Sequence, residues 1–130
     1  MALQQHAGFG TPSILSQTTG IDAKSTGTTT LFTVPTGYRG YITEIVFRAT
    51  TVTAFGGTVP TLGVGVAAGE ADIMPSTALT GFDATNEIYR FSCEGTYVSV
   101  AAGSAIKLGI DTGATGTTFT IEVYLIGFLT

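Results

Sequence analysis

The chain has 130 residues, of which 44% are hydrophobic and only 11% are charged, with a formal net charge of −4. This length predicts one domain that holds a hydrophobic core without disulfides, and the single cysteine, Cys93, excludes an internal disulfide and is expected in the core. Five basic residues against nine acidic ones argue against a nucleic-acid-binding surface, and no apolar run approaches the ~20 residues that a membrane helix needs.

Residues 1–27 are rich in Gln, Ser, Thr and Gly and contain one short strand-like stretch, Ser13–Ser16. We therefore expect an extended N-terminal arm over residues 1–27, followed by a β-domain over residues 28–130. Two interpretations of the arm stay open: a disordered tail, or a segment that becomes ordered only against a neighbouring subunit. The first eight residues lack the basic and apolar regions of a secretion signal.

The next residues alternate as strands do, since successive side chains of a strand point to opposite faces. A first strand begins at Thr28 and ends at the turn Pro35-Thr36-Gly37. A second covers residues 41–53, and its expected inward residues are Thr43, Ile45, Phe47 and Ala49, with Glu44, Arg48 and Thr50 outward.

A third strand, residues 61–68, places Leu62, Val64 and Val66 on one side and two glycines, Gly63 and Gly65, on the other. A stripe without side chains allows another backbone to approach closely. A loosely packed edge strand is the alternative, and the sequence favours neither.

Residues 69–86 form the longest irregular stretch, and loops of this length usually carry function or contacts. Within it and just beyond, Asp83-Ala84-Thr85-Asn86-Glu87 offers the oxygen ligands that calcium prefers. Turn and capping hydrogen bonds are the alternative use of these oxygens, and they account for the pattern without an ion.

Further strands follow over residues 87–93, 97–101 and 104–111. Their expected inward residues are Tyr89, Phe91, Cys93, Ile106, Leu108 and Ile110, and their outward residues include Arg90 and Lys107. Five strand charges lie out of phase with the core, as a correct register requires: Glu44, Arg48, Arg90, Lys107 and Glu122.

The last strand, residues 117–129, has two unequal faces. Its inward face carries Phe119, Ile121, Val123, Leu125 and Leu129. The other face begins with water-facing residues, Thr118, Thr120 and Glu122, and continues with Tyr124, Ile126 and Phe128, which are costly to leave in water. We expect a second surface, such as a partner chain, to cover these three.

Six to eight strands with short glycine-rich turns and no helical periodicity predict an all-β fold. The expected architecture is an antiparallel β-sandwich of the jelly-roll type.

Catalytic and metal-binding groups are scarce. His6, the only histidine, lies in the arm, so a Ser-His-Asp or Cys-His arrangement has no base, and one Cys and one His do not make a zinc site. Asp111-Thr112-Gly113-Ala114 is similar to the aspartic-protease signature, but fewer than twenty residues follow it. A hairpin loop explains the segment without catalysis, so we prefer the loop. We expect no enzymatic activity and no cofactor.

Four segments carry a resemblance to a known family: Val34-Pro35-Thr36-Gly37-Tyr38, Tyr41-Ile42-Thr43-Glu44-Ile45, Gly103-Ser104-Ala105-Ile106 and the strand from Glu122 to Leu129. Together they resemble small jelly-roll capsid decoration (cement) proteins of tailed bacteriophages, and modules of tail-fibre tips. The resemblance implies a virion component on the capsid surface, commonly a homotrimer, that binds the major capsid protein and stabilises the shell.

On this interpretation Tyr124, Ile126 and Phe128 form the subunit interface, and Phe9, Ile14 and Leu15 of the arm contact the capsid. The alternative function is a receptor-binding, glycan-binding jelly-roll module of a tail fibre or head fibre. Exposed loop aromatics would favour it, and outside the arm the loops contain Tyr38, Phe55 and Phe82. An enzyme ranks third, because the catalytic groups are missing.

Overall fold

The computed structural model describes residues 12–67, 69–93 and 98–130, and within them it contains nine strands and no helix. The strands are β1 (Ser13–Asp22), β2 (Gly27–Thr33), β3 (Gly40–Thr53), β4 (Thr61–Gly65), β5 (Met74–Ala78), β6 (Ile88–Ser92), β7 (Val98–Val100), β8 (Ala105–Thr112) and β9 (Thr118–Leu129). All strand pairs are antiparallel. No helix of the described part is long and apolar enough to cross a membrane.

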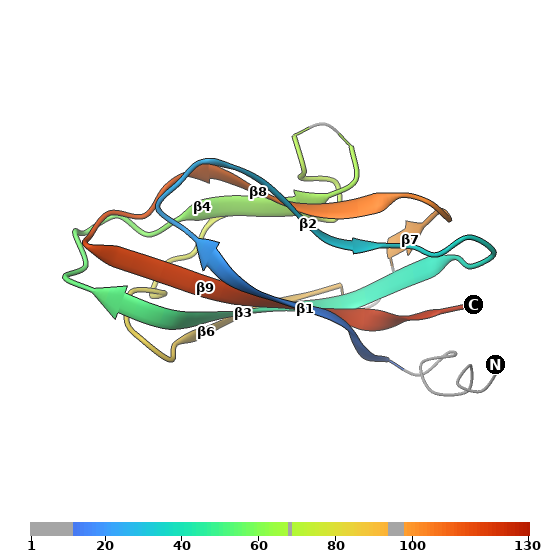
Figure 1. Cartoon of the computed structure of the whole chain (residues 1–130), viewed down its shortest axis with the longest axis horizontal. Helices are drawn as coiled ribbons and strands as arrows, with labels where there is room; N and C mark the ends of the chain where they lie inside the picture. Colours follow the sequence, from blue (N-terminus) through green and yellow to red (C-terminus); the bar gives the residue numbers. More distant parts are fainter. Residues whose placement is uncertain (1–11, 68, 94–97) are drawn as a thin grey trace.

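Two sheets lie face to face as the layers of a sandwich (Figure 1). One, called here the β9 sheet, has the order β1-β9-β3-β6, and β7 also pairs with β3. The other, the β8 sheet, has the order β2-β8-β4-β5. The all-β antiparallel sandwich expected from the sequence is therefore confirmed.

Strand β1 is an edge strand of the β9 sheet, although the sequence placed residues 13–22 in the arm. It pairs with β9 from Ser13↔Gly127 to Asp22↔Thr120, and two register shifts interrupt the ladder. These shifts break the regular alternation of side chains, which hides the strand in the sequence. The β-domain thus includes residues 13–27, whereas residues 1–11 lie outside the described residues.

Strand β5 is the second element that the sequence did not predict, because it lies in the stretch expected to be irregular. Its ladder runs along β4 at the edge of the β8 sheet. The strand is short and contains Pro75, which cannot donate to a ladder and is therefore tolerated at a sheet edge. The other seven strands lie where the sequence predicted them.

The core lies between the two sheets and follows the predicted inward faces. Phe119, Ile121, Val123 and Leu125 are buried from the β9 sheet, and Ile106, Leu108 and Ile110 from the β8 sheet. Cys93 is also buried, as predicted, and this burial raises the pKa of its thiol. Each large apolar side chain removed from water contributes roughly 1.5–3 kcal/mol to stability.

The register of β3 changes at Thr43, which the sequence placed inward. Ile42 and Ile45 are both fully buried, although strict alternation would put them on opposite faces. A register shift between Ile42 and Glu44 accounts for this, because the extra residue restores the inward phase of Ile45. Thr43 is half-buried, and its hydroxyl donates to the carbonyl of Ile126 at 3.2 Å.

The glycine stripe on β4 is covered by the chain itself. A β-carbon on Gly63 would lie 2.7 Å from the carbonyl oxygen of Glu70, and one on Gly65 would lie 2.7 Å from the amide nitrogen of Asp72. The Asp72 carboxylate also accepts a 2.8 Å hydrogen bond from the amide of Val66. Of the two interpretations left open by the sequence, the structure shows close backbone approach, and the approaching segment is residues 69–73.

Candidate subunit interface

The three residues predicted to form an interface, Tyr124, Ile126 and Phe128, alternate along β9 on the face that points away from the core. Tyr124 and Ile126 are half-buried, whereas Phe128 is only 7% exposed. Phe128 stacks on Tyr41 of β3, with ring centroids 5.1 Å apart. The structure therefore brings the three together on the outer face of the β9 sheet, and part of the predicted covering comes from the neighbouring strand.

The predicted capsid-contacting residues separate from one another. Ile14 lies directly opposite Ile126 in the ladder, so it joins the same outer face, and it is 61% exposed. Leu15 is half-buried and packs against the core. Phe9 lies outside the described residues. Ile14 and Ile126 are thus one surface, although the sequence assigned them to two different contacts.

Other apolar residues of this face were missed by the sequence analysis. Ile88 on β6 is 55% exposed and lies opposite Arg48, and Val46 lies opposite Tyr124. Both share the phase of outward charged residues, Arg90 for Ile88 and Arg48 for Val46. That phase was the available signal, because an isoleucine in step with outward charges must lie on the outer face.

A polar network crosses the centre of this face. Arg48 on β3 donates a 2.7 Å hydrogen bond to Glu122 on β9, and the Tyr124 hydroxyl donates to the same carboxylate at 2.9 Å. The side-chain amide of Gln17 on β1 donates to Glu122 at 3.3 Å, and Arg48 also donates to Asn86 at 3.0 Å. Three strands are thereby joined through one carboxylate.

Glu122 is only 5% exposed, whereas the sequence pattern made it a water-facing residue. Burial alone would raise its pKa, but hydrogen bonds from Arg48, Tyr124 and Gln17 outweigh burial and hold the pKa below its ordinary value. The hydrogen bond to this carboxylate, aided by burial, raises the pKa of the Tyr124 hydroxyl. At neutral pH the network therefore holds a charged Glu122 and a protonated Tyr124.

The oxygen-rich turn at residues 83–87 uses its oxygens within the chain. The Glu87 carboxylate accepts hydrogen bonds from the amides of Asp83 at 2.7 Å and Ala84 at 3.1 Å, and the first of these chiefly lowers its pKa. The hydroxyl of Thr85 accepts from the amide of Val52 at 2.9 Å. These contacts are the turn and capping bonds that the sequence offered as the alternative to an ion site.

The Asp-Thr-Gly segment spans the end of β8 and the start of the next loop, and its residues contact other parts of the chain. Asp111 is exposed and accepts a hydrogen bond from the Ser76 hydroxyl. The Lys24 carbonyl comes so close to Gly113 that a side chain there would collide with it. The buried Ala114 donates its amide to the carbonyl of Ala23 at 2.8 Å. The glycine therefore lets the loop after β8 pack against the loop after β1.

Two of the three loop aromatics point into the molecule. Phe82 is buried, and its ring centroid lies 5.9 Å from that of Phe119 in the core. Phe55 is half-buried and lies 6.2 Å from the same ring. Tyr38, at 41% exposure, is the exposed member of the group.

Comparison with known proteins identifies a shared fold. No family model and no curated protein matches the chain. A chain of the cyanophage Pam1 capsid asymmetric unit matches with a TM-score of 0.55 and 17% identity, over 88% of this chain and 82% of that chain. A chain of the acidic stable capsid structure of Helicobacter pylori bacteriophage KHP30 matches with a TM-score of 0.58 and 10% identity, over 91% of both.

Proposed function

We propose that this protein is a bacteriophage virion component that binds the outer surface of the capsid and stabilises the shell as a decoration (cement) protein. The carrying observation is the similarity to chains from two phage capsids, which extends over most of each chain in both directions. The matched chains are therefore whole subunits of about this length, not single modules of larger proteins. Fold alone does not determine function, so the proposal also draws on the outer face of the β9 sheet.

That face has the composition of a contact surface. It combines aliphatic side chains such as Ile14 and Ile126 with an aromatic pair and a satisfied polar network, as protein interfaces do. A protein that holds a shell together needs such contact area and no reactive group.

We further propose that the protein forms a homotrimer and that its sandwich is a jelly roll. A closed ring of three requires two different patches on each subunit. The exposed Ile14 and Ile88 support this, because they lie on strands at opposite edges of the β9 sheet. The jelly-roll assignment is supported by four-strand orders in both sheets, with β6 and β7 taken together as one interrupted strand along β3.

The test of the capsid role is the composition of purified particles. Particles from cells that carry the gene are banded by density, and the chain is quantified by mass spectrometry and located by electron cryomicroscopy. We expect it in a fixed ratio to the major capsid protein, as density on the outside of the shell. Its absence from particles, or its presence only at fibre tips, would refute the proposal.

The role of the N-terminal residues before β1 can be tested separately from the β-domain. Deleting residues 2–11 leaves β1 intact, and we expect this variant to fold and to bind the capsid more weakly if Phe9 contacts the shell. A longer deletion that reaches into residues 13–22 would remove β1 and expose the edge of β9, so it would not isolate the contribution of the N-terminal residues. Equal capsid binding by the chain without residues 2–11 would dismiss a role for Phe9.

A further inference from the structure

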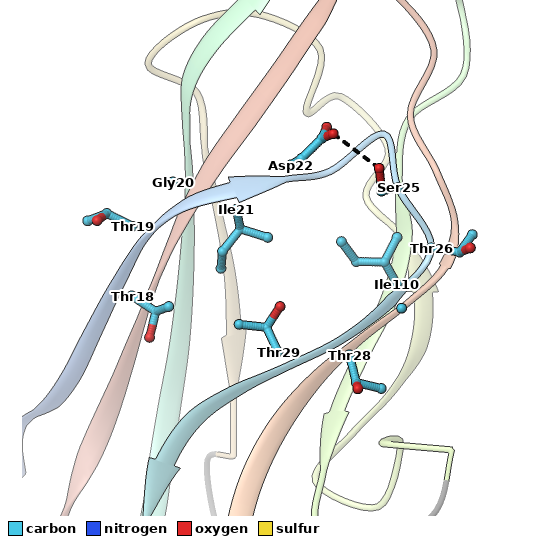
Figure 2. Close-up of a pocket in the computed structure, with 11 residues that line it drawn as sticks. Thr18, Thr19, Gly20, Ile21, Asp22, Ser25, Thr26, Thr28, Thr29 and Ile110 are labelled. Atoms are coloured by element: carbon cyan, nitrogen blue, oxygen red, sulfur yellow. Dashed lines mark hydrogen bonds between the residues drawn. The ribbon is translucent and has the colours of Figure 1, made fainter.

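A cavity of about 280 Å³ opens between the edge strands of the two sheets. It is lined by residues at the end of β1, by the turn that follows, and by the start of β2 (Figure 2). The lining residues are Thr18, Thr19, Gly20, Ile21, Asp22, Ser25, Thr26, Gly27, Thr28, Thr29 and Ile110. This volume lies just below the range of drug-sized sites and suits a ligand of about one ring.

The cavity combines an apolar floor with hydroxyl groups. Ile21, Ile110 and Thr29 point toward one another in its centre (Figure 2), and both isoleucines are buried. Thr18 and Thr29 lie opposite the buried residues Val123 and Leu108, so both face the gap between the sheets. A ligand in this gap would meet aliphatic carbon below and hydroxyl groups on two sides.

The threonine hydroxyl groups of this cavity make no hydrogen bond within the described part of the chain. Elsewhere threonines donate to backbone carbonyls, as Thr43 does to Ile126 and Thr50 does to Thr120. By contrast, among residues 12–67, 69–93 and 98–130, no side-chain hydrogen bond involves the threonines of the cavity, Thr18, Thr19, Thr26, Thr28 and Thr29. The hydroxyl groups of Thr18 and Thr29, which face the gap, can each donate and accept, so the pair matches a ligand that carries hydroxyl groups.

The charge of the cavity selects against anions. Asp22 is its one charged residue, and its two carboxylate oxygens accept from the Lys24 amide at 3.0 Å and the Ser25 hydroxyl at 3.1 Å. The Asp22 side chain points away from Ile21 and Thr29 (Figure 2), so its carboxylate does not face the centre of the cavity. No lining side chain is cationic, so a phosphate or an acidic sugar would find no opposite charge to pair with.

The edge of β1 is also unsuited to adding a partner strand here. The β1–β9 ladder shifts register between Thr18 and Ile21, and Gly20 has a φ of +70°. Such a bulge twists an edge away from regular strand pairing and often occurs beside binding sites. The local backbone therefore favours a compact ligand over an extended peptide.

We propose that the cavity between β1 and β2 binds a neutral sugar ring, with its hydroxyl groups on Thr18 and Thr29 and its carbon face on Ile21 and Ile110. The site is independent of the proposed capsid role. A ligand this small is expected to bind in the millimolar range.

The test is an NMR titration of the full-length chain with glucose, galactose, mannose and N-acetylglucosamine, with tetrahydropyran and N-acetylneuraminic acid as controls. We expect at least one neutral sugar to cause saturable shifts confined to the amides of residues 18–29 and 110. Tetrahydropyran, which lacks hydroxyl groups, and the anionic sugar should cause none.

Matched variants locate the site. Thr29→Val keeps the side-chain shape and should weaken sugar binding about three- to tenfold. Thr30→Val is the control on the same strand, because Thr30 is not part of the lining, and it should bind as the wild type does. No saturable shift with any neutral sugar, or equal binding by Thr29→Val, would overturn the proposal. Cavity amides that move only with protein concentration would also overturn it, since they would show a contact between copies.

Discussion

Ile14 on β1 lies directly opposite Ile126 on β9, so residues from the two ends of the chain share one outer face. If this face is the subunit contact, replacing either isoleucine by serine should weaken self-association by about tenfold or more. Sedimentation velocity over a concentration series measures this change. Ile14→Ser should alter the free energy of unfolding by less than about 0.5 kcal/mol, because Ile14 is exposed.

The matched control for this contact is Val66→Ser, which removes an exposed apolar side chain from the loop after β4. This variant should sediment as the wild type does. A wild-type protein that sediments as single subunits at every concentration would contradict the interface, as would an Ile14→Ser variant with unchanged assembly.

The ion pair between Arg48 and Glu122 should matter more than the pair between Arg90 and Glu44. Glu122 is buried, so Arg48→Met leaves a carboxylate with reduced pairing, and we expect a loss of about 1–3 kcal/mol. The Arg90 side chain is 65% exposed, and it lies 3.0 Å from Glu44, which is 27% exposed. Because water competes for this pair, Arg90→Met should change stability by less than about 0.5 kcal/mol. Urea unfolding of both variants checks the difference. Equal losses would argue against the network.

The lowered pKa of Glu122 predicts how stability depends on pH. Because the carboxyl group has a lower pKa when folded, it stabilises the protein fully above its unfolded pKa of about 4.3. This contribution is lost as the pH falls below that value and through the folded pKa. Urea midpoints measured from pH 7 to pH 3 should therefore fall more steeply for the wild type than for Glu122→Gln. Parallel curves would exclude Glu122 as a source of acid sensitivity.

Gly127 should be intolerant of a side chain. The carbonyl oxygen of Tyr41 occupies the place that a β-carbon on Gly127 would take, so Gly127→Ala must displace the paired backbone of β3. We expect a loss of about 3 kcal/mol or more. Gly103→Ala is the comparison, because it has open space but a φ of +82°, and it should cost only about 1 kcal/mol. Thermal unfolding ranks the two, and a larger loss at Gly103 would contradict the steric explanation.

The sequence predicted the sandwich because most strands alternate cleanly between apolar and polar residues. In β8 and β9 the residues placed inward, such as Leu108 and Leu125, are buried. Two strands, β1 and β5, were not predicted. β1 combines polar residues with two register shifts, and β5 carries Pro75. Both lie at sheet edges, where one neighbour suffices and the hydrophobic pattern is weakest.

The apolar residues of the outer face of the β9 sheet were predicted in part. Tyr124, Ile126 and Phe128 could be recognised because apolar side chains occupied an outward phase. Ile88 lies in a strand of five residues, where alternation is too brief to stand out. Glu122 could not be recognised as buried, because its burial comes from Gln17, Arg48 and Tyr124, and cross-strand partners are set by the register.

The loop of residues 69–73 makes the two outer faces of the sandwich chemically different. The loop covers the outer side of β4 and contributes the carboxylates of Glu70 and Asp72. The outer face of the β9 sheet, on the other side of the molecule, carries exposed isoleucines. The two outer faces of the sandwich therefore differ in chemistry, so a partner surface can distinguish one from the other.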